Sequence, residues 1–123
     1  MSSSSIRVVN QTRGRTLAEQ CELARTFWAR GLGLMGRASL APSQGLIIYP
    51  EWSIHTFFMR FPIDVLFLGP DDRVLGIRVA MPPYRPFAGF WGARYVIELP
   101  PEILVKTETQ VGDQLELTPP LHH

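Results

Sequence analysis

The chain has 123 residues, 46% of them apolar, which is enough for one domain whose core needs no disulfide or metal. A formal net charge of +1 gives no electrostatic reason to expect a nucleic-acid partner. The sequence contains one cysteine, shows no signal-peptide pattern and has no apolar run near the ~18 residues of a membrane span. We therefore expect a cytoplasmic protein without a membrane partner.

We expect residues 1–123 to form a single domain in which residues 1–5 and 118–123 are disordered. The 11 prolines and 10 glycines predict many turns and short elements, which is typical of a β-rich domain.

The N-terminal third predicts two strands and one short helix. Apolar alternation predicts strands over Ile6–Val9 and Leu17–Leu23. Thr26 suits the N-cap of a helix over Phe27–Leu32, because its hydroxyl can accept a bond from an early backbone N–H. The stretch Gly31–Gly36 matches G-x-G-x-x-G, but it follows a predicted helix instead of joining a strand to a helix, so we expect no dinucleotide binding.

The rest of the chain predicts six more strands, bounded mostly by proline, glycine or aspartate: Leu46–Tyr49, Ile54–Met59, Asp64–Gly69, Val74–Met81, Tyr95–Leu99 and Gln114–Leu117. Gly69–Asp72 predicts the turn of a hairpin, and Pro100–Leu104 predicts a helical turn. Asp64–Gly69 is apolar on both faces, which indicates a central strand. The expected fold is mainly β, an antiparallel β-sandwich or barrel-like domain of about eight short strands with one or two short helices.

The segment Glu51–Asp64 combines aromatic side chains with charged ones, as the lining of a ligand pocket does. We therefore expect a cleft beside residues 53–64 that binds a small anionic ligand or a peptide. The alternative is structural: Asp64 bonds backbone N–H groups or pairs with Arg60, and His55 is a satisfied, partly buried side chain. The candidate ligand-binding residues are Arg37, His55, Thr56, Met59, Arg60, Asp64, Tyr84 and Glu98.

A second hypothesis places a protein-interaction surface on the aromatic loop Pro82–Gly92. Within that loop we expect Phe87 and Phe90 to fold back over one end of the barrel, and Tyr84 and Arg85 to face the surface.

A third hypothesis is a hydrolase-like enzyme that uses His55 with Asp64 or Glu98 as acid and base. His55 is the only histidine outside the C-terminal pair His122 and His123, so ligands for a metal are scarce, and we predict no metal and no cofactor. We rank the binding domain first, the interaction domain second and the enzyme third.

Five sequence blocks occur in a familiar order: Gly33–Arg37, Gly45–Ile48, Thr56–Leu68, Tyr95–Leu99 and Gly112–Asp113. Together they resemble the domain-of-unknown-function 192 family of small bacterial and archaeal proteins, from about Leu17 to Leu117. The resemblance implies a compact β-sandwich or barrel-like fold with one or two short helices, and it implies no established reaction. Its motifs single out these positions: Met35, Arg37, Met59, Arg60, Pro62, Asp64, Glu98 and Asp113.

Overall fold

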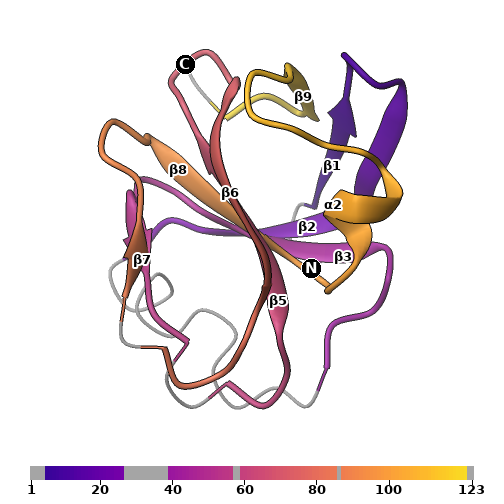
Figure 1. The fold of residues 1–123 in the computed structure, drawn as a ribbon. Helices are drawn as coiled ribbons and strands as arrows, with labels where there is room; N and C mark the ends of the chain where they lie inside the picture. Colours follow the sequence, from indigo (N-terminus) through magenta and orange to yellow (C-terminus); the bar gives the residue numbers. More distant parts are fainter. Residues whose placement is uncertain (1–4, 27–38, 57–58, 86, 122–123) are drawn as a thin grey trace.

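The computed structural model describes residues 5–26, 39–56, 59–85 and 87–121, and within them the protein is mainly β-structure (Figure 1). Its elements follow in chain order: β1 (Ile6–Asn10), β2 (Arg15–Ala24), β3 (Gln44–Ile48), β4 (Ser53–Ile54), β5 (Ile63–Leu68), β6 (Val74–Met81), β7 (Ala88–Gly89), β8 (Tyr95–Leu99), α2 (Ile103–Lys106) and β9 (Leu115–Thr118). The predicted mainly β class is confirmed. No helix in these residues is long and apolar enough to cross a membrane.

Seven strands form one curled sheet in the order β6-β5-β8-β3-β2-β1-β9, and β4 pairs with β7 in a separate small sheet. Every pairing is antiparallel except the one between β2 and β3, which is parallel. The prediction of a purely antiparallel sheet is therefore wrong at this pair. Alternation of apolar residues identifies a strand but does not fix its direction, and residues 25–43 are long enough for the crossover that a parallel pair needs.

The two outer strands of the seven-stranded sheet, β6 and β9, meet at one end. The Val74 N–H donates to the Asp113 carbonyl oxygen at 2.9 Å, and the Gly112 N–H donates to the Val74 carbonyl oxygen at 2.8 Å. A bridge between Arg73 and Gln114 adds to this contact. Closure at one end only makes the fold a half-barrel, in line with the barrel-like prediction.

The central strands β5 and β8 are buried along their whole length. Their alternate side chains enter two separate apolar clusters: Leu66 and Ile97 belong to the cluster shared with β1, β9 and α2, whereas Val65 and Val96 belong to the cluster beside β4 and β7. This confirms the interpretation of the β5 region as central, because a strand apolar on both faces must be covered on both. The hairpin to β6 is also present, with the Asp72 N–H donating to the Gly69 carbonyl oxygen at 3.1 Å.

Most predicted strands match the observed ones to within two residues at each end, and three predicted segments differ more in kind or extent. The expected strand Ile54–Met59 is a strand only at Ser53–Ile54 among the described residues. The expected loop Pro82–Gly92 contains β7, which pairs back on β4. The expected helical turn at Pro100–Leu104 begins later, at Ile103, after Glu102 in a left-handed conformation with φ 78°.

Residues 118–121 belong to the ordered fold, contrary to the expectation of disorder. Thr118 ends β9, and Leu121 is buried in the cluster that contains β1. The guanidinium of Arg25 donates to the Leu121 carbonyl oxygen at 3.1 Å. The predicted helix over 27–32, the G-x-G-x-x-G stretch and Arg37 lie outside the described residues.

Candidate functional site

Asp64 is a structural residue, which corrects its assignment to a ligand cleft. The side chain is fully buried in β5. Its Oδ1 accepts the backbone N–H of Ala80 at 2.8 Å, and its Oδ2 accepts the N–H of Leu104 at 2.9 Å. The first bond lies where the β5–β6 register shifts, and the second ties α2 to the sheet. Oδ1 therefore satisfies a backbone donor that the irregular register leaves without a ladder partner, and Oδ2 satisfies an N–H in the first turn of α2, which has no acceptor within the helix.

Thr56 holds the segment after β6 against the end of β4. Its hydroxyl donates to the Pro82 carbonyl oxygen at 2.8 Å and accepts the N–H of Arg85 at 2.7 Å. Its backbone N–H donates to the Arg85 carbonyl oxygen, and its carbonyl oxygen accepts the N–H of Tyr84. Thr56 is buried, so its role is to position Arg85 and not to contact a ligand. The Tyr84 side chain is exposed, as expected.

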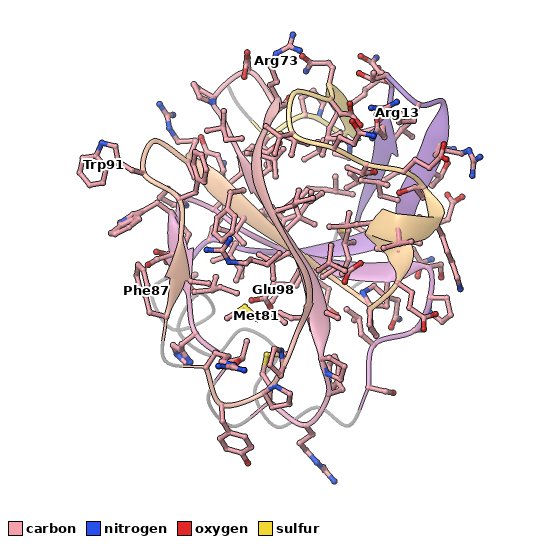
Figure 2. The ribbon with its side chains drawn as sticks, in the orientation of Figure 1. Arg13, Arg73, Met81, Phe87, Trp91 and Glu98 are labelled. Atoms are coloured by element: carbon pink, nitrogen blue, oxygen red, sulfur yellow. The ribbon has the colours of Figure 1, made fainter. Side chains whose placement is uncertain are left out.

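Met59 and Glu98 are buried, whereas His55 and Arg60 are exposed. Met59 packs in the apolar cluster beside β4 and β7. Glu98 pairs across the sheet with residues of β3 and β5, and Figure 2 shows it in the interior of the molecule. Arg37 lies outside the described residues, and the seven other candidates do not line one open cleft, because four of them are buried and three are exposed.

The acid–base hypothesis needs His55 and a carboxylate together in an open site. His55 is exposed, but Asp64 and Glu98 are 0% and 2% exposed. The structure therefore offers no site in which His55 and either carboxyl group both meet solvent, and this arrangement does not support general acid–base catalysis.

A pocket of about 250 Å³ lies between β6 and the segment that contains β7. It is open to solvent, and its lining is mainly apolar with two arginines: Arg78, Val79, Met81, Pro82, Arg85, Phe87 and Ala88. Because β7 pairs with β4, this pocket lies next to the segment in which the sequence predicted a cleft, but other residues line it. Of the predicted residues, Thr56 acts here indirectly, through its bonds to Pro82 and Arg85.

Arg78 and Arg85 give the pocket its charge. Both side chains are exposed, and neither forms an ion pair or hydrogen bond with a side chain of the described residues. No acidic residue is among those that line the pocket. Arg78 comes from an outer strand of the main sheet, where three successive residues are exposed. Two guanidinium groups over an apolar floor can bind an anion with an apolar body.

Three aromatic side chains form a cluster beside this pocket: Trp52, Phe87 and Trp91. Trp52 lies 5.8 Å from Phe87 and 5.8 Å from Trp91, measured between ring centroids, with edge-on angles of 69° and 76°. Gly89 makes this packing possible, because a Cβ there would lie 2.8 Å from Cζ of Phe87 and 3.1 Å from Cζ3 of Trp52. Figure 2 shows Phe87 and Trp91 on the same side of the molecule, with Trp91 projecting from its surface.

The sequence predicts that Phe87 and Phe90 both fold back over one end of the barrel, but in the structure the two residues differ. Phe90 does so in part: its ring lies 6.4 Å from that of Phe67 and covers Gly76, where a Cβ would lie 2.6 Å from Cδ2 of the ring. Phe87 remains 60% exposed and contacts Trp52 instead. The reason is the β4–β7 pairing, which a local sequence pattern does not reveal.

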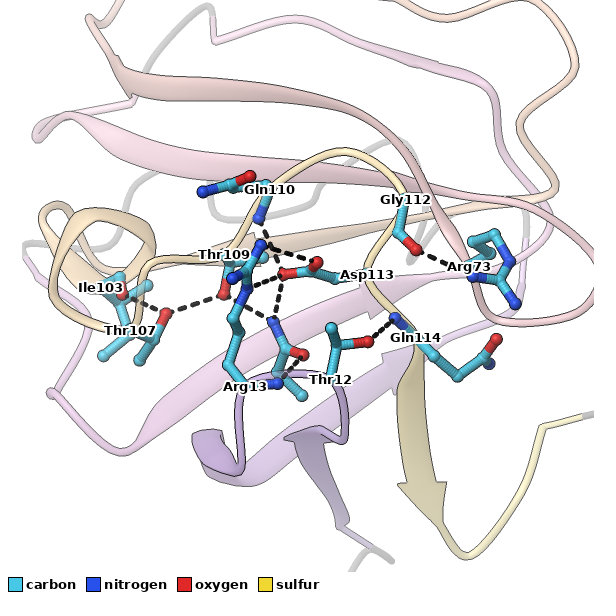
Figure 3. Close-up of polar contacts among 11 residues, drawn as sticks. Thr12, Arg13, Arg73, Ile103, Thr107, Thr109, Gln110, Gly112, Asp113 and Gln114 are labelled. Carbon is cyan, nitrogen blue, oxygen red and sulfur yellow. Dashed lines mark hydrogen bonds and ion pairs between the residues drawn. The ribbon is translucent and has the colours of Figure 1, made fainter.

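A buried polar cluster around Asp113 lies at the end where β6 and β9 meet (Figure 3). Oδ2 of Asp113 accepts bonds from Asn10 Nδ2, Arg13 Nε and the Gln110 N–H, each at 3.0 Å. Burial by itself raises the pKa of Asp113, but the bonds from Arg13, Asn10 and Gln110 outweigh it and leave the pKa below its usual value. The cluster joins the β1–β2 turn to the segment before β9, and its role is structural.

Among the described residues, no group of three or more histidine, cysteine, aspartate or glutamate side chains could hold a metal ion. Cys21 is buried, and burial raises the pKa of its thiol to about 12, which makes it a poor nucleophile. Nothing in these residues therefore favours nucleophilic catalysis by Cys21.

Fold and site together define a class of protein: a mainly β half-barrel domain with an open, arginine-lined pocket beside exposed aromatic side chains. The family model DUF192, described as "Uncharacterized ACR, COG1430", matches residues 8–117, and the chain belongs to this family. The resemblance seen in the sequence blocks is thereby confirmed.

The chain is similar in sequence to UPF0127 proteins and in fold to a solved crystal structure. A UPF0127 protein of Pyrococcus furiosus is 34% identical over 115 residues, covering 89% of this chain and 96% of that protein. A UPF0127 protein of Thermococcus sibiricus is 31% identical over 113 residues, covering 89% and 73%. The crystal structure of a protein of unknown function from Novosphingobium aromaticivorans matches with a TM-score of 0.79 and 28% identity, covering 91% of this chain and 83% of that one. None of these names states an activity.

Proposed function

We propose that this chain is a binding domain whose pocket between β6 and β7 receives the anionic group of a small ligand or of a peptide. The observation that carries the proposal is the pair Arg78 and Arg85, which line a mainly apolar pocket without an acidic neighbour in its lining. Guanidinium groups bind carboxylate and phosphate in a planar, two-bonded geometry, and the apolar part of the lining can contact an apolar group beside that anion. An anion with an apolar body therefore suits this pocket better than a neutral or cationic ligand.

The size of the pocket limits the ligand. Its volume of about 250 Å³ is below the range of roughly 300–1,000 Å³ that is usual for pockets that enclose a drug-sized molecule. The pocket therefore fits a short carboxylate, a phosphate ester or one peptide side chain. We expect such small probes to bind weakly, with dissociation constants of about 1 mM, which corresponds to roughly 4 kcal/mol of binding free energy.

The rigid support of Arg85 favours the proposal. Thr56 fixes both the N–H and the carbonyl of Arg85 from the end of β4, so the backbone of this residue is held before a ligand arrives. Arg78 is on β6 of the main sheet, where it pairs with Val65 of β5. Arginines on held backbone lose less freedom on binding than arginines on a free loop, which increases affinity.

The test is an NMR titration of the ¹⁵N-labelled protein with three anions: hexanoate, phenylacetate and phenyl phosphate. Separate titrations with hexanol and benzyl alcohol serve as uncharged controls. We expect chemical shift changes at Arg78, Val79 and Ala88 with the anions only, because the guanidinium groups discriminate by charge. The double variant Arg78→Gln with Arg85→Gln should lose these changes.

Arg15→Gln serves as the matched control, because Arg15 is exposed at the start of β2, where it pairs with Asn10 of β1, and it does not line the pocket. This variant should bind like the unmodified protein. Absence of any shift in the pocket with all three anions, or equal binding by the double variant, would overturn the proposal.

A further inference from the structure

The aromatic cluster is unusually exposed for side chains of its size. Trp91 is 86% exposed, Phe87 60% and Trp52 43%, and they lie together on one surface. Contiguous exposed aromatic side chains mark binding surfaces, since tryptophan offers a large contact area with only two rotatable bonds to restrict. Phe87 also lines the arginine pocket, so cluster and pocket form one continuous surface.

The geometry of the rings favours an apolar side chain over a flat ligand. Trp52 meets both of its neighbours edge-on, at 69° and 76°. The three rings therefore do not form a coplanar platform for a sugar ring or a nucleobase. A bulky apolar side chain can pack against their exposed surfaces.

The two parts of the surface adjoin at Phe87, which both lines the arginine pocket and contacts Trp52. Alternate residues of an extended chain point to the same side about 6.8 Å apart. A peptide that places one side chain in the arginine pocket can therefore direct the side chain two residues away toward the adjoining aromatic cluster. The pocket alone holds about one side chain, so the aromatic cluster has to supply most of the remaining contact area.

The charge of the surface selects the partner. Arg78 and Arg85 face the pocket without an acidic neighbour in its lining, which favours an acidic peptide and disfavours a basic one. A second copy of this chain fits poorly, because a two-fold axis at this surface would bring the same two arginines together.

The peptide has to be recognised through its side chains, because β6 is protected against strand addition. Although β6 is an outer strand, its register shifts against β5 between the pairs at Ile63 and Val65. At this irregularity Ala80 has φ 52°, and its N–H is already donated to Asp64. Such bulges disrupt the regular edge that another strand would need.

We propose that this surface binds an extended acidic segment of a partner protein, with a carboxylate between Arg78 and Arg85 and a bulky apolar side chain against Trp52, Phe87 and Trp91. This inference rests on the proposed function and names its ligand class. Hydrophobic anchoring at the aromatic cluster supplies affinity, and the arginine pocket fixes direction and register along the peptide.

The experiment measures binding of the full chain to synthetic peptides by calorimetry and by tryptophan fluorescence. Each peptide is acetylated and amidated and carries Glu-Ser-Leu, Glu-Ser-Phe or Glu-Ser-Trp between serine and glycine flanks. Matched peptides replace glutamate with glutamine, or the apolar residue with serine. We expect the acidic–apolar peptides to bind, and either replacement to weaken binding by about tenfold or more.

Variants separate the two parts of the surface. Trp91→Ala should weaken the binding of the acidic–apolar peptides by about tenfold or more, while the weak binding of hexanoate stays unchanged. Val105→Ala is the control, because Val105 is 65% exposed on α2 and lies outside the surface. Trp91 is so exposed that its replacement leaves the core intact, and an unchanged thermal midpoint verifies this.

The outcomes distinguish the two proposals. If hexanoate binds through the arginines but the peptides bind no more tightly than hexanoate, or if Trp91→Ala has no effect, the peptide inference is wrong and the proposed function stands. If neither hexanoate nor any peptide binds at the arginines, both are wrong. Tighter binding to the glutamine peptides than to the glutamate peptides would also overturn the inference.

Discussion

Replacing Asp64 with asparagine is expected to destabilise the fold by about 1–3 kcal/mol, although the side chain keeps its size. In the native protein the carboxylate accepts the N–H of Ala80 and the N–H of Leu104. An amide has one accepting oxygen, so its NH₂ group must face the second N–H. One buried donor then loses its acceptor, and the cost is its desolvation.

Asp64→Ala removes both acceptors and should cost about 2–6 kcal/mol, twice the range for one orphaned donor. This is a large part of the 5–15 kcal/mol that stabilises a typical domain, so the alanine variant is expected to be partly unfolded at room temperature. The asparagine variant is therefore the informative one. With a urea dependence of about 2 kcal/mol per molar, a loss of about 2 kcal/mol lowers the urea midpoint by about 1 M.

The assay is urea unfolding followed by circular dichroism, together with hydrogen exchange of the Ala80 and Leu104 amides. Glu116→Gln makes the same chemical change on an exposed residue of β9 and should alter stability by less than about 0.5 kcal/mol. An Asp64→Asn midpoint equal to that of the control, with both amides still protected, would refute the structural role of this carboxylate.

Three other residues give simpler predictions. The folded pKa of Asp113 lies below its unfolded value of about 3.9, so its contribution to stability is present above that pH and is lost as the pH falls through the folded pKa. Unfolding midpoints between about pH 2.5 and pH 6 should therefore fall less steeply with acid for Asp113→Asn than for the unmodified protein, and parallel curves would contradict this. Cys21, buried with a pKa of about 12, should react with an aromatic disulfide reagent only after unfolding in urea, and rapid reaction of the native protein would be inconsistent with its burial. Gly45→Ala would place a Cβ 2.7 Å from Sγ of Cys21 and 3.0 Å from Cδ2 of Leu99, which should cost about 1–3 kcal/mol in calorimetry; an unchanged melting temperature would show that the core yields easily.

Much of the fold could be predicted because its signals are local. The turn at Gly69–Asp72 joins two strands at the expected place, and the fully apolar run after Asp64 is a central strand. The parallel pairing of β2 with β3 could not be predicted, because direction depends on the path of residues 25–43 and not on the pattern within either strand.

The site was harder to predict because it depends on contacts between distant segments. The pocket exists because β7 pairs with β4, which brings Phe87 and Arg85 close to Arg78. The sequence predicts Arg85 at the surface, but it indicates Arg78 only as part of a hairpin strand. Asp64 was a plausible ligand-binding residue by its aromatic neighbours, yet its partner Leu104 lies 40 residues further along the chain. A charged residue in an outer strand beside a proline-rich loop is the signal that could have found Arg78.

The placement of β1 between β2 and β9 has a consequence for how the protein folds. Val8 pairs with Leu117, so the sheet joins residues from opposite ends of the described chain. Proteins dominated by such distant pairings fold slowly, on the order of milliseconds to seconds, because closing long loops costs conformational entropy before any stabilising contact forms. During synthesis on the ribosome the β1–β2 hairpin can form early, but the outer edge of β1 stays open until Leu115–Thr118 emerge. An open edge is the place where a nascent sheet aggregates, and β9 covers this edge although it is the last of the described strands to be synthesised.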